Sequence, residues 1–227
     1  MRSRILLLYA LGIAALWAGC SHTSSEVPAS QQPSAPAAPA ASDPVTAFET
    51  VRAVLQSPRC QNCHPAGDRP LQGDQSLVHT MNVERGPDGH GLPGAHCGTC
   101  HGNANPPDSY GAHQPPGVST DWHLPPPDVK MVFVGRSPKE LCEQLKDPQR
   151  NGGKDMAALV THVSTDPLVL WGWAPGFGRQ PVAVPRAEFV SAFRRWADAG
   201  GPCPSDGPKA AARLEEPSSA PVRGSGR

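Results

Sequence analysis

Two short segments of this sequence repeat one arrangement of sulfur and imidazole side chains. Each has two cysteines separated by two residues and a histidine directly after the second: Cys60, Cys63 and His64 form the first motif, and Cys97, Cys100 and His101 form the second. Cys-x-x-Cys-His is the covalent attachment site of c-type haem. Two thiols at this spacing can add to the two vinyl groups on one porphyrin edge, and the adjoining histidine then lies beneath the iron as its proximal ligand. The motifs therefore predict two c-type haems.

The same four cysteines allow other interpretations. Two Cys-x-x-Cys pairs can hold one Zn²⁺ ion tetrahedrally, and the pairs could also form redox-active or structural disulfides. Histidine is scarce, with 9 among 227 residues. Its presence directly after both pairs therefore favours haem over zinc and over disulfides.

The composition predicts a mainly α, loop-rich fold. The chain has 23 glycines and 28 prolines, roughly twice the usual share of these turn-forming residues, and aromatic residues make up only 5%. With so little aromatic mass, we expect the two haems to form much of the core of a dihaem c-type cytochrome-like domain. Lys+Arg and Asp+Glu are balanced at 20 each, which argues against a nucleic-acid partner because such proteins normally carry a basic excess.

Start and stop signals predict four helices within this domain. They are expected over about 44–56, 138–147, 154–164 and 186–199. Asp43 caps the first, which runs directly into the first motif, and Ser137 with Glu140 forms a capping box at the start of the second. Pro/Gly-rich loops separate the helices, most densely over 86–127, and no series of alternating strands is evident.

The first 19 residues have the features of an export signal. Two arginines precede the apolar run Ile5–Trp17, which is too short to span a bilayer permanently. The following Ala18-Gly19-Cys20 resembles the lipobox of bacterial lipoproteins, in which the cysteine becomes the lipidated first residue. Because Ser21 rather than Asp comes next, we expect sorting to the outer membrane. An ordinary secretory signal with an incidental cysteine is the alternative.

The regions flanking the domain are polar and rich in Ala, Pro, Ser and Gly. Residues 20–43 are expected to form the lipidated cysteine and a disordered tether, and 204–227 a disordered tail. Between them, 44–203 has the size of one domain. The sequence thus predicts a lipoprotein of the bacterial cell envelope that faces the periplasm.

Two cysteines remain once the anchor and the motifs are assigned. In an oxidising compartment, the leftover Cys142 and Cys203 suggest a disulfide between the second and last predicted helices. The alternative is two unpaired buried thiols.

An electron-carrying haem usually keeps a sixth ligand, His or Met, on the face opposite its proximal histidine. The candidates for this distal position are His79, Met81, His123, Met131 and His162, ahead of His90 and His113. His79 and Met81 follow the first motif closely and are expected to reach the first haem. His123 follows the second motif in the same way. His162 lies on an apolar helix face, and the alternative for each histidine is a surface or hydrogen-bonded side chain. Bis-His ligation would lower the reduction potential and His/Met would raise it.

From Cys60 onward the chain resembles a family of small exported dihaem cytochrome c-like proteins of bacteria, some of which are labelled isoquinoline 1-oxidoreductase subunits. The resemblance covers about 50–203 and rests on these stretches: 60–70, 81–89, 97–101, 122–124, 140–148, 151–153 and 170–176. It implies covalent haem attachment at both motifs.

These features favour a membrane-tethered electron carrier between redox partner proteins over an enzyme. The chain lacks the cysteine spacing of plant-type iron–sulfur clusters and is too short for a molybdenum cofactor domain, so at most it would be an electron-transfer subunit of an oxidoreductase. The alternatives are a dihaem peroxidase, a haem sensor or, least favoured, a structural zinc protein.

Overall fold

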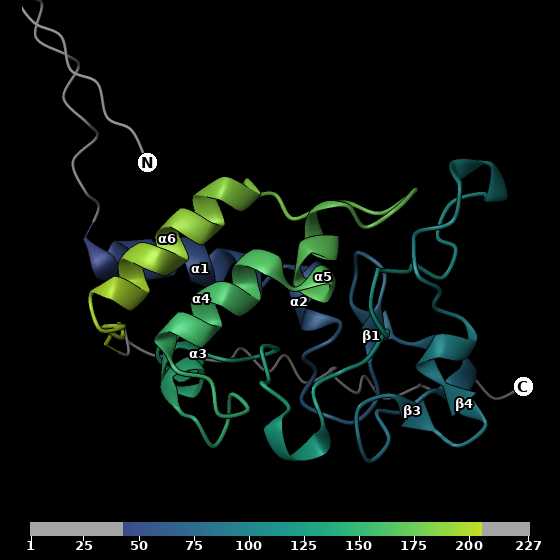
Figure 1. Cartoon of the computed structure of the whole chain (residues 1–227), viewed down its shortest axis with the longest axis horizontal. Coiled ribbons are helices and arrows are strands. Elements are labelled where there is room, and N and C mark those ends of the chain that lie inside the picture. Colours follow the sequence, from purple (N-terminus) through teal and green to yellow (C-terminus); the bar gives the residue numbers. More distant parts are fainter. Residues whose placement is uncertain (1–42, 206–227) are drawn as a thin grey trace, which may run out of the picture. The chain divides into compact units, whose positions relative to one another are not determined.

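The computed structural model describes residues 43–205 (Figure 1). The expected signal peptide, the lipidation site Cys20, the tether up to residue 42 and the tail from residue 206 lie outside the described residues. Among the described residues, no helix is both long enough and apolar enough to cross a bilayer.

The described residues are mainly helical and rich in loops, as the composition predicts. The helices are α1 (Pro44–Leu55), α2 (Pro58–Gln61), α3 (Pro138–Lys146), α4 (Met156–Thr165), α5 (Pro167–Leu170) and α6 (Arg186–Asp198). Short 3₁₀ turns are η1 (Thr80–Asn82), η2 (Cys97–Thr99), η3 (Asp108–Tyr110), η4 (Pro127–Val129) and η5 (Trp171–Trp173). The four helices expected from the sequence are confirmed within two residues at each end, whereas α2 and α5 had no strong signal because each is about one turn long.

Side-chain caps explain where α1, α3 and α4 begin. The Asp43 carboxylate accepts a hydrogen bond from the backbone N–H of Thr46 at the start of α1. At α3, the Ser137 hydroxyl accepts from the Glu140 backbone while the Glu140 carboxylate accepts from the Ser137 backbone, which completes the capping box. The Asp155 carboxylate accepts a hydrogen bond from the Ala158 backbone N–H at the start of α4. This helix therefore begins two residues later than expected.

The hydrophobic core lies between α1, α3, α4 and α6. Figure 1 shows α6 alongside α1, and α4 also packs against α6. Phe48 of α1 lies 5.2 Å from Trp196 of α6 between ring centroids, and both side chains are fully buried. A disulfide between Cys142 of α3 and Cys203, just after α6, links two ends of this core.

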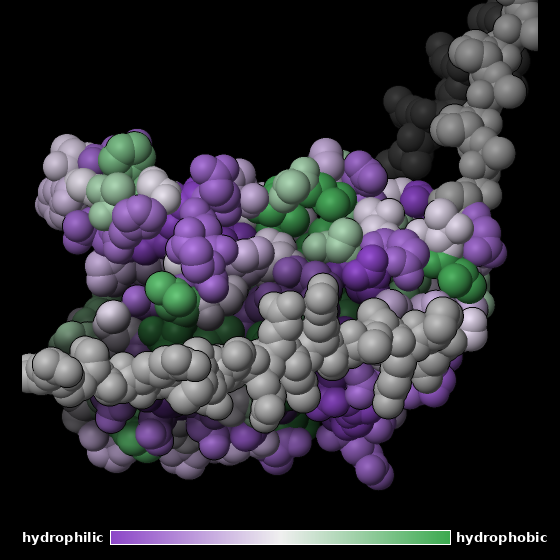
Figure 2. All heavy atoms as spheres, turned by 180° about the vertical axis from the view of Figure 1, so that it is seen from behind, coloured by the Kyte–Doolittle hydropathy of each residue, from purple (hydrophilic) through white to green (hydrophobic). Residues whose placement is uncertain are grey.

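Loops and two small hairpins fill the region between α2 and α3. Strands β1 (Leu71–Gln72) and β2 (Leu77–Val78) pair antiparallel, as do β3 (Gly91–Leu92) and β4 (Ala95–His96). The face seen in Figure 2 is mostly hydrophilic, and its apolar residues form separate small groups.

Candidate functional site

The first motif borders a cavity of about 250 Å³ inside the helical core. Ser57 caps α2, which carries Cys60; Cys60, Cys63 and His64 all line the cavity. Apolar side chains from α1, α3, α4 and α6 form much of the remaining wall, among them Val54, Leu145, Leu159, Phe189 and Phe193, and loop residues complete it. An apolar wall with a few polar groups is typical of sites that bind organic ligands, and the volume lies just below their usual range of about 300–1,000 Å³.

Hydrogen bonding fixes the tautomer of the His64 imidazole. Its Nδ1 donates to the Met131 carbonyl at 2.8 Å and also lies 3.3 Å from the Lys130 carbonyl. Phe133 stacks on the ring at a centroid distance of 4.0 Å. Burial lowers the pKa of His64 to about 4. The ring is therefore neutral at pH 7, and Nε2 keeps the lone pair that a metal ligand needs.

The thiols of the first motif are also desolvated. Burial raises the pKa of Cys60 to about 12 and that of Cys63 to about 11, so both remain neutral thiols at pH 7. A zinc site would need four thiolates in one cluster. Within residues 43–205, no three side chains of His, Cys, Asp or Glu are gathered where they could hold a metal ion.

The second motif lies in a more open part of the molecule. Cys97 opens η2 and is half-buried, while Cys100 is exposed. His101 Nδ1 donates to the Pro116 carbonyl at 2.8 Å, which repeats the protonation pattern of His64. Gly117 permits this contact, because a Cβ there would overlap the backbone of the 102–104 segment. Burial also lowers the pKa of His101.

The two motifs are neighbours in space. His123, which lines the first cavity, stacks on His90 at a centroid distance of 5.0 Å, and His90 in turn stacks on His96, the residue before Cys97. Aromatic rings also connect the two sites. Trp122 stacks on His101 at a centroid distance of 4.4 Å and an angle of 5°, and its edge meets Trp171 at 5.2 Å. Trp171 precedes Gly172, which lines the first cavity.

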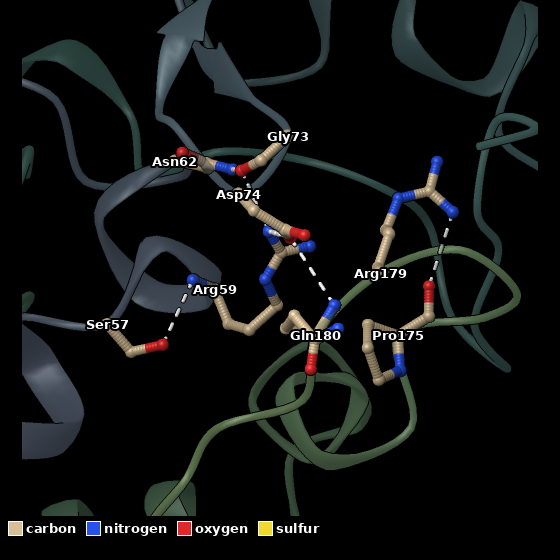
Figure 3. A network of polar contacts seen from close by, with 8 residues as sticks. All are labelled: Ser57, Arg59, Asn62, Gly73, Asp74, Pro175, Arg179 and Gln180. Carbon is tan, nitrogen blue, oxygen red and sulfur yellow. Dashed lines mark hydrogen bonds and ion pairs between the residues drawn. The ribbon is translucent and has the colours of Figure 1, made fainter.

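A buried arginine ties the first motif to two loops (Figure 3). The Arg59 side chain is 2% exposed and donates to both Asp74 and the Gly73 carbonyl at 2.7 Å. Asp74 also accepts from the Gln180 backbone, and the Arg59 guanidinium lies 5.6 Å from the Trp171 ring centroid. Burial lowers the pKa of Arg59, and the Asp74 carboxylate offsets part of this effect.

Replacing Asp74 by alanine is expected to destabilise the protein by about 2 kcal/mol, because it removes a charged hydrogen-bond acceptor from the buried Arg59 guanidinium. Asp74→Asn is the matched control, since it keeps an acceptor oxygen and should cost less. Chemical unfolding of both variants measures the difference. Equal stability of Asp74→Ala and the unchanged protein would contradict the role of this ion pair.

Two distal-ligand candidates lie at the opposite site from the one expected. From the sequence, His79 is expected at the first motif and His123 at the second. His79 does not line the first cavity but lies opposite His101, with ring centroids 6.3 Å apart at an angle of 61°. His123 lines the first cavity, and its ring stacks on His90 rather than on His101. His162 of α4 also lines the first cavity.

The two methionine candidates are less well placed than the histidines to be distal ligands. Met81 has a side chain that is 84% exposed. Met131 borders the cavity, and its backbone carbonyl accepts the hydrogen bond from His64 Nδ1, so it lies beside that ring. Neither of the remaining histidines considered from the sequence, His90 and His113, lines the cavity.

Asp166 was not singled out from the sequence, although its spacing from His162 could have revealed it. Asp166 follows His162 by four residues, and its carboxylate lies 3.2 Å from His162 Nδ1. Residues at this spacing face each other on a helix. The carbonyls of Met131 and Pro116 carry no such sequence signal, because they come from loops far along the chain.

The chain matches no family model, no curated protein and no solved structure. The family resemblance of its motifs therefore remains a prediction from the sequence.

Proposed function

We propose that the protein is a dihaem c-type cytochrome that carries electrons between redox partner proteins. In this proposal Cys60 and Cys63 attach one haem and Cys97 and Cys100 attach the other, with His64 and His101 as proximal iron ligands. When bound, each haem iron supplies one-electron chemistry by changing between its ferrous and ferric states. The domain would be a mainly α cytochrome in which the porphyrins fill space that side chains leave open.

The observation that carries this proposal is that His64 and His101 have the same hydrogen-bonding pattern. In both, Nδ1 donates to a backbone carbonyl at 2.8 Å, which orients the ring and leaves Nε2 for a metal. Metal-ligating histidines almost always have such a partner on the second nitrogen. The exposed His79 and His123 make the same carbonyl contact, so what distinguishes the two motif histidines is that burial also lowers the pKa of both.

The chain's own residues would support electron transfer by holding the ligands still. The largely apolar wall of the first cavity would surround the first centre. Trp122 packs flat against His101 at the second. The stacked rings of His123, His90 and His96 would place the two centres close together.

The proposed setting is the bacterial cell envelope. The export signal and Cys20 would make the protein a periplasm-facing lipoprotein, with the outer membrane as the expected destination. The tether would let the domain move between an electron donor and an acceptor.

Haem counting tests this proposal directly. The full-length protein, expressed with c-type haem maturation machinery, is expected to contain two covalently attached haems per chain by pyridine haemochrome analysis. The haems should remain with the polypeptide under denaturing conditions, because thioether bonds are covalent. Haem-free protein that carries bound zinc by elemental analysis would overturn the proposal.

A further inference from the structure

We propose that both iron centres have two histidine ligands, with His162 as the second ligand at the first centre and His79 at the second. This inference rests on the proposed haem-binding function and names residues that the attachment motifs do not include.

His162 approaches the first cavity from the side of α4. It lines the same cavity as His64. Helix α4 is capped by Asp155 and buries Leu159 and Val163 against the core. The imidazole is therefore presented by a rigid element, which a fixed iron ligand requires.

Asp166 gives His162 the bonding pattern of a metal ligand. Its Oδ2 lies 3.2 Å from His162 Nδ1, while its Oδ1 accepts from the Leu168 backbone at 2.9 Å. The carboxylate is thus fixed and favours a proton on Nδ1, which leaves Nε2 free. Carboxylate–histidine–metal arrangements of this kind recur in metal sites, where the carboxylate orients the ring and raises its basicity. Asp166 is a positioning residue in this proposal.

The His79 and His101 rings have the separation of two ligands of one metal ion. Histidine–metal bonds are about 2 Å long, so imidazoles bound on opposite sides of one ion have centroids about 6 Å apart. The observed separation is 6.3 Å. His79 Nδ1 donates to the Thr80 carbonyl at 2.7 Å, which again leaves Nε2 available.

His123 and Met81 are the alternative distal ligands closest to these centres, and neither has all the features described for His162 and His79. His123 reaches the first cavity, but its ring lies against His90 at a centroid distance of 5.0 Å and its Nδ1 partner is the Asp121 carbonyl on an exposed loop. Met81 is close to His79 in sequence and turns its side chain to solvent. Two histidine ligands at each iron would close both coordination shells, which favours electron transfer over peroxide or gas binding.

Alanine variants of His162 and His79 test the assignment, with His123→Ala as the matched control. Each protein is prepared in full length with haem maturation, and its haem content and iron spin state are measured separately. The unchanged protein is expected to have two low-spin haems. Each of the two variants should keep two covalent haems while one of them becomes high-spin by electron paramagnetic resonance, and added imidazole should restore the low-spin signal. His123→Ala should remain fully low-spin.

A conservative variant keeps the test usable if His162→Ala does not fold. His162→Met retains a ligand and should raise the reduction potential of one haem only, because a His/Met pair favours ferrous iron more than two histidines do.

The outcomes separate the two proposals. A haem-free protein overturns the proposed function. A protein with two haems overturns the inference if His162→Ala and His79→Ala leave both irons low-spin, or if His123→Ala produces the high-spin signal instead.

Discussion

Replacing Cys60 and Cys63 together by serine is expected to cost the protein most of its folding stability. Their cavity of about 250 Å³ lies among core side chains, and an unfilled cavity destabilises a protein by about 24 cal/mol per Å³. Loss of the group that we propose fills it would therefore cost about 6 kcal/mol. This is comparable with the whole stability of a typical domain, about 5–15 kcal/mol.

The same change at Cys97 and Cys100 is expected to leave the helical core folded. Cys100 is exposed and Cys97 only half-buried, and none of the residues in the second motif belongs to the hydrophobic core. The expected loss is less than about 1 kcal/mol, as for substitutions away from a core. The two attachment sites thus differ in structural importance although their sequences have the same form.

Thermal unfolding followed by circular dichroism compares the two double-serine variants with the unchanged protein. Each variant is expected to contain one covalent haem per chain. The Cys60/Cys63 variant should melt on the order of 15 °C lower, given about 2–4 °C per kcal/mol for a domain of this size. Similar melting temperatures for the two variants, at one haem each, would contradict the proposed difference.

The long helices could be predicted because their signals are local. Asp43 and the Ser137–Glu140 capping box satisfy backbone groups within one turn, so neighbouring sequence alone determines where these helices begin. The motif cysteines and histidines follow from fixed spacing for the same reason.

The partner of His79 could not be predicted, because a turn reverses the chain before it. The His79 backbone donates to the Pro70 carbonyl at the end of the β1–β2 hairpin, and the ring then lies by His101 instead of the nearer motif. Closeness in sequence to His64 was therefore misleading. His162 lies much further along the chain and reaches the first cavity because α4 packs against the core.

Contacts between distant loops escaped prediction for a related reason. The Trp122–Trp171 contact and the Arg59–Asp74 ion pair join segments with no shared periodicity. Only the assembled fold brings them together. Both contacts nevertheless lie directly between or beside the two motifs, which makes the loops part of the site.

Replacing Cys142 and Cys203 by alanine is expected to destabilise the protein by about 4 kcal/mol. The disulfide joins residues 61 positions apart, and cross-linking a loop of this length lowers the entropy of the unfolded chain by about that amount. Cys142 is fully buried on α3, and Leu145 of the same helix lines the first cavity. The bridge thus holds one wall of the cavity against the segment that follows α6.

Alanine is the appropriate replacement, because a serine hydroxyl at the buried Cys142 position would add an unsatisfied polar group. Mutation is also preferable to chemical reduction, which would change the iron oxidation state at the same time. Chemical unfolding of the double variant should show the loss while the haem content remains two per chain, since neither cysteine belongs to an attachment motif. A loss below about 1 kcal/mol, or a loss of haem with unchanged stability, would show that the bridge does not stabilise the cavity wall in this way.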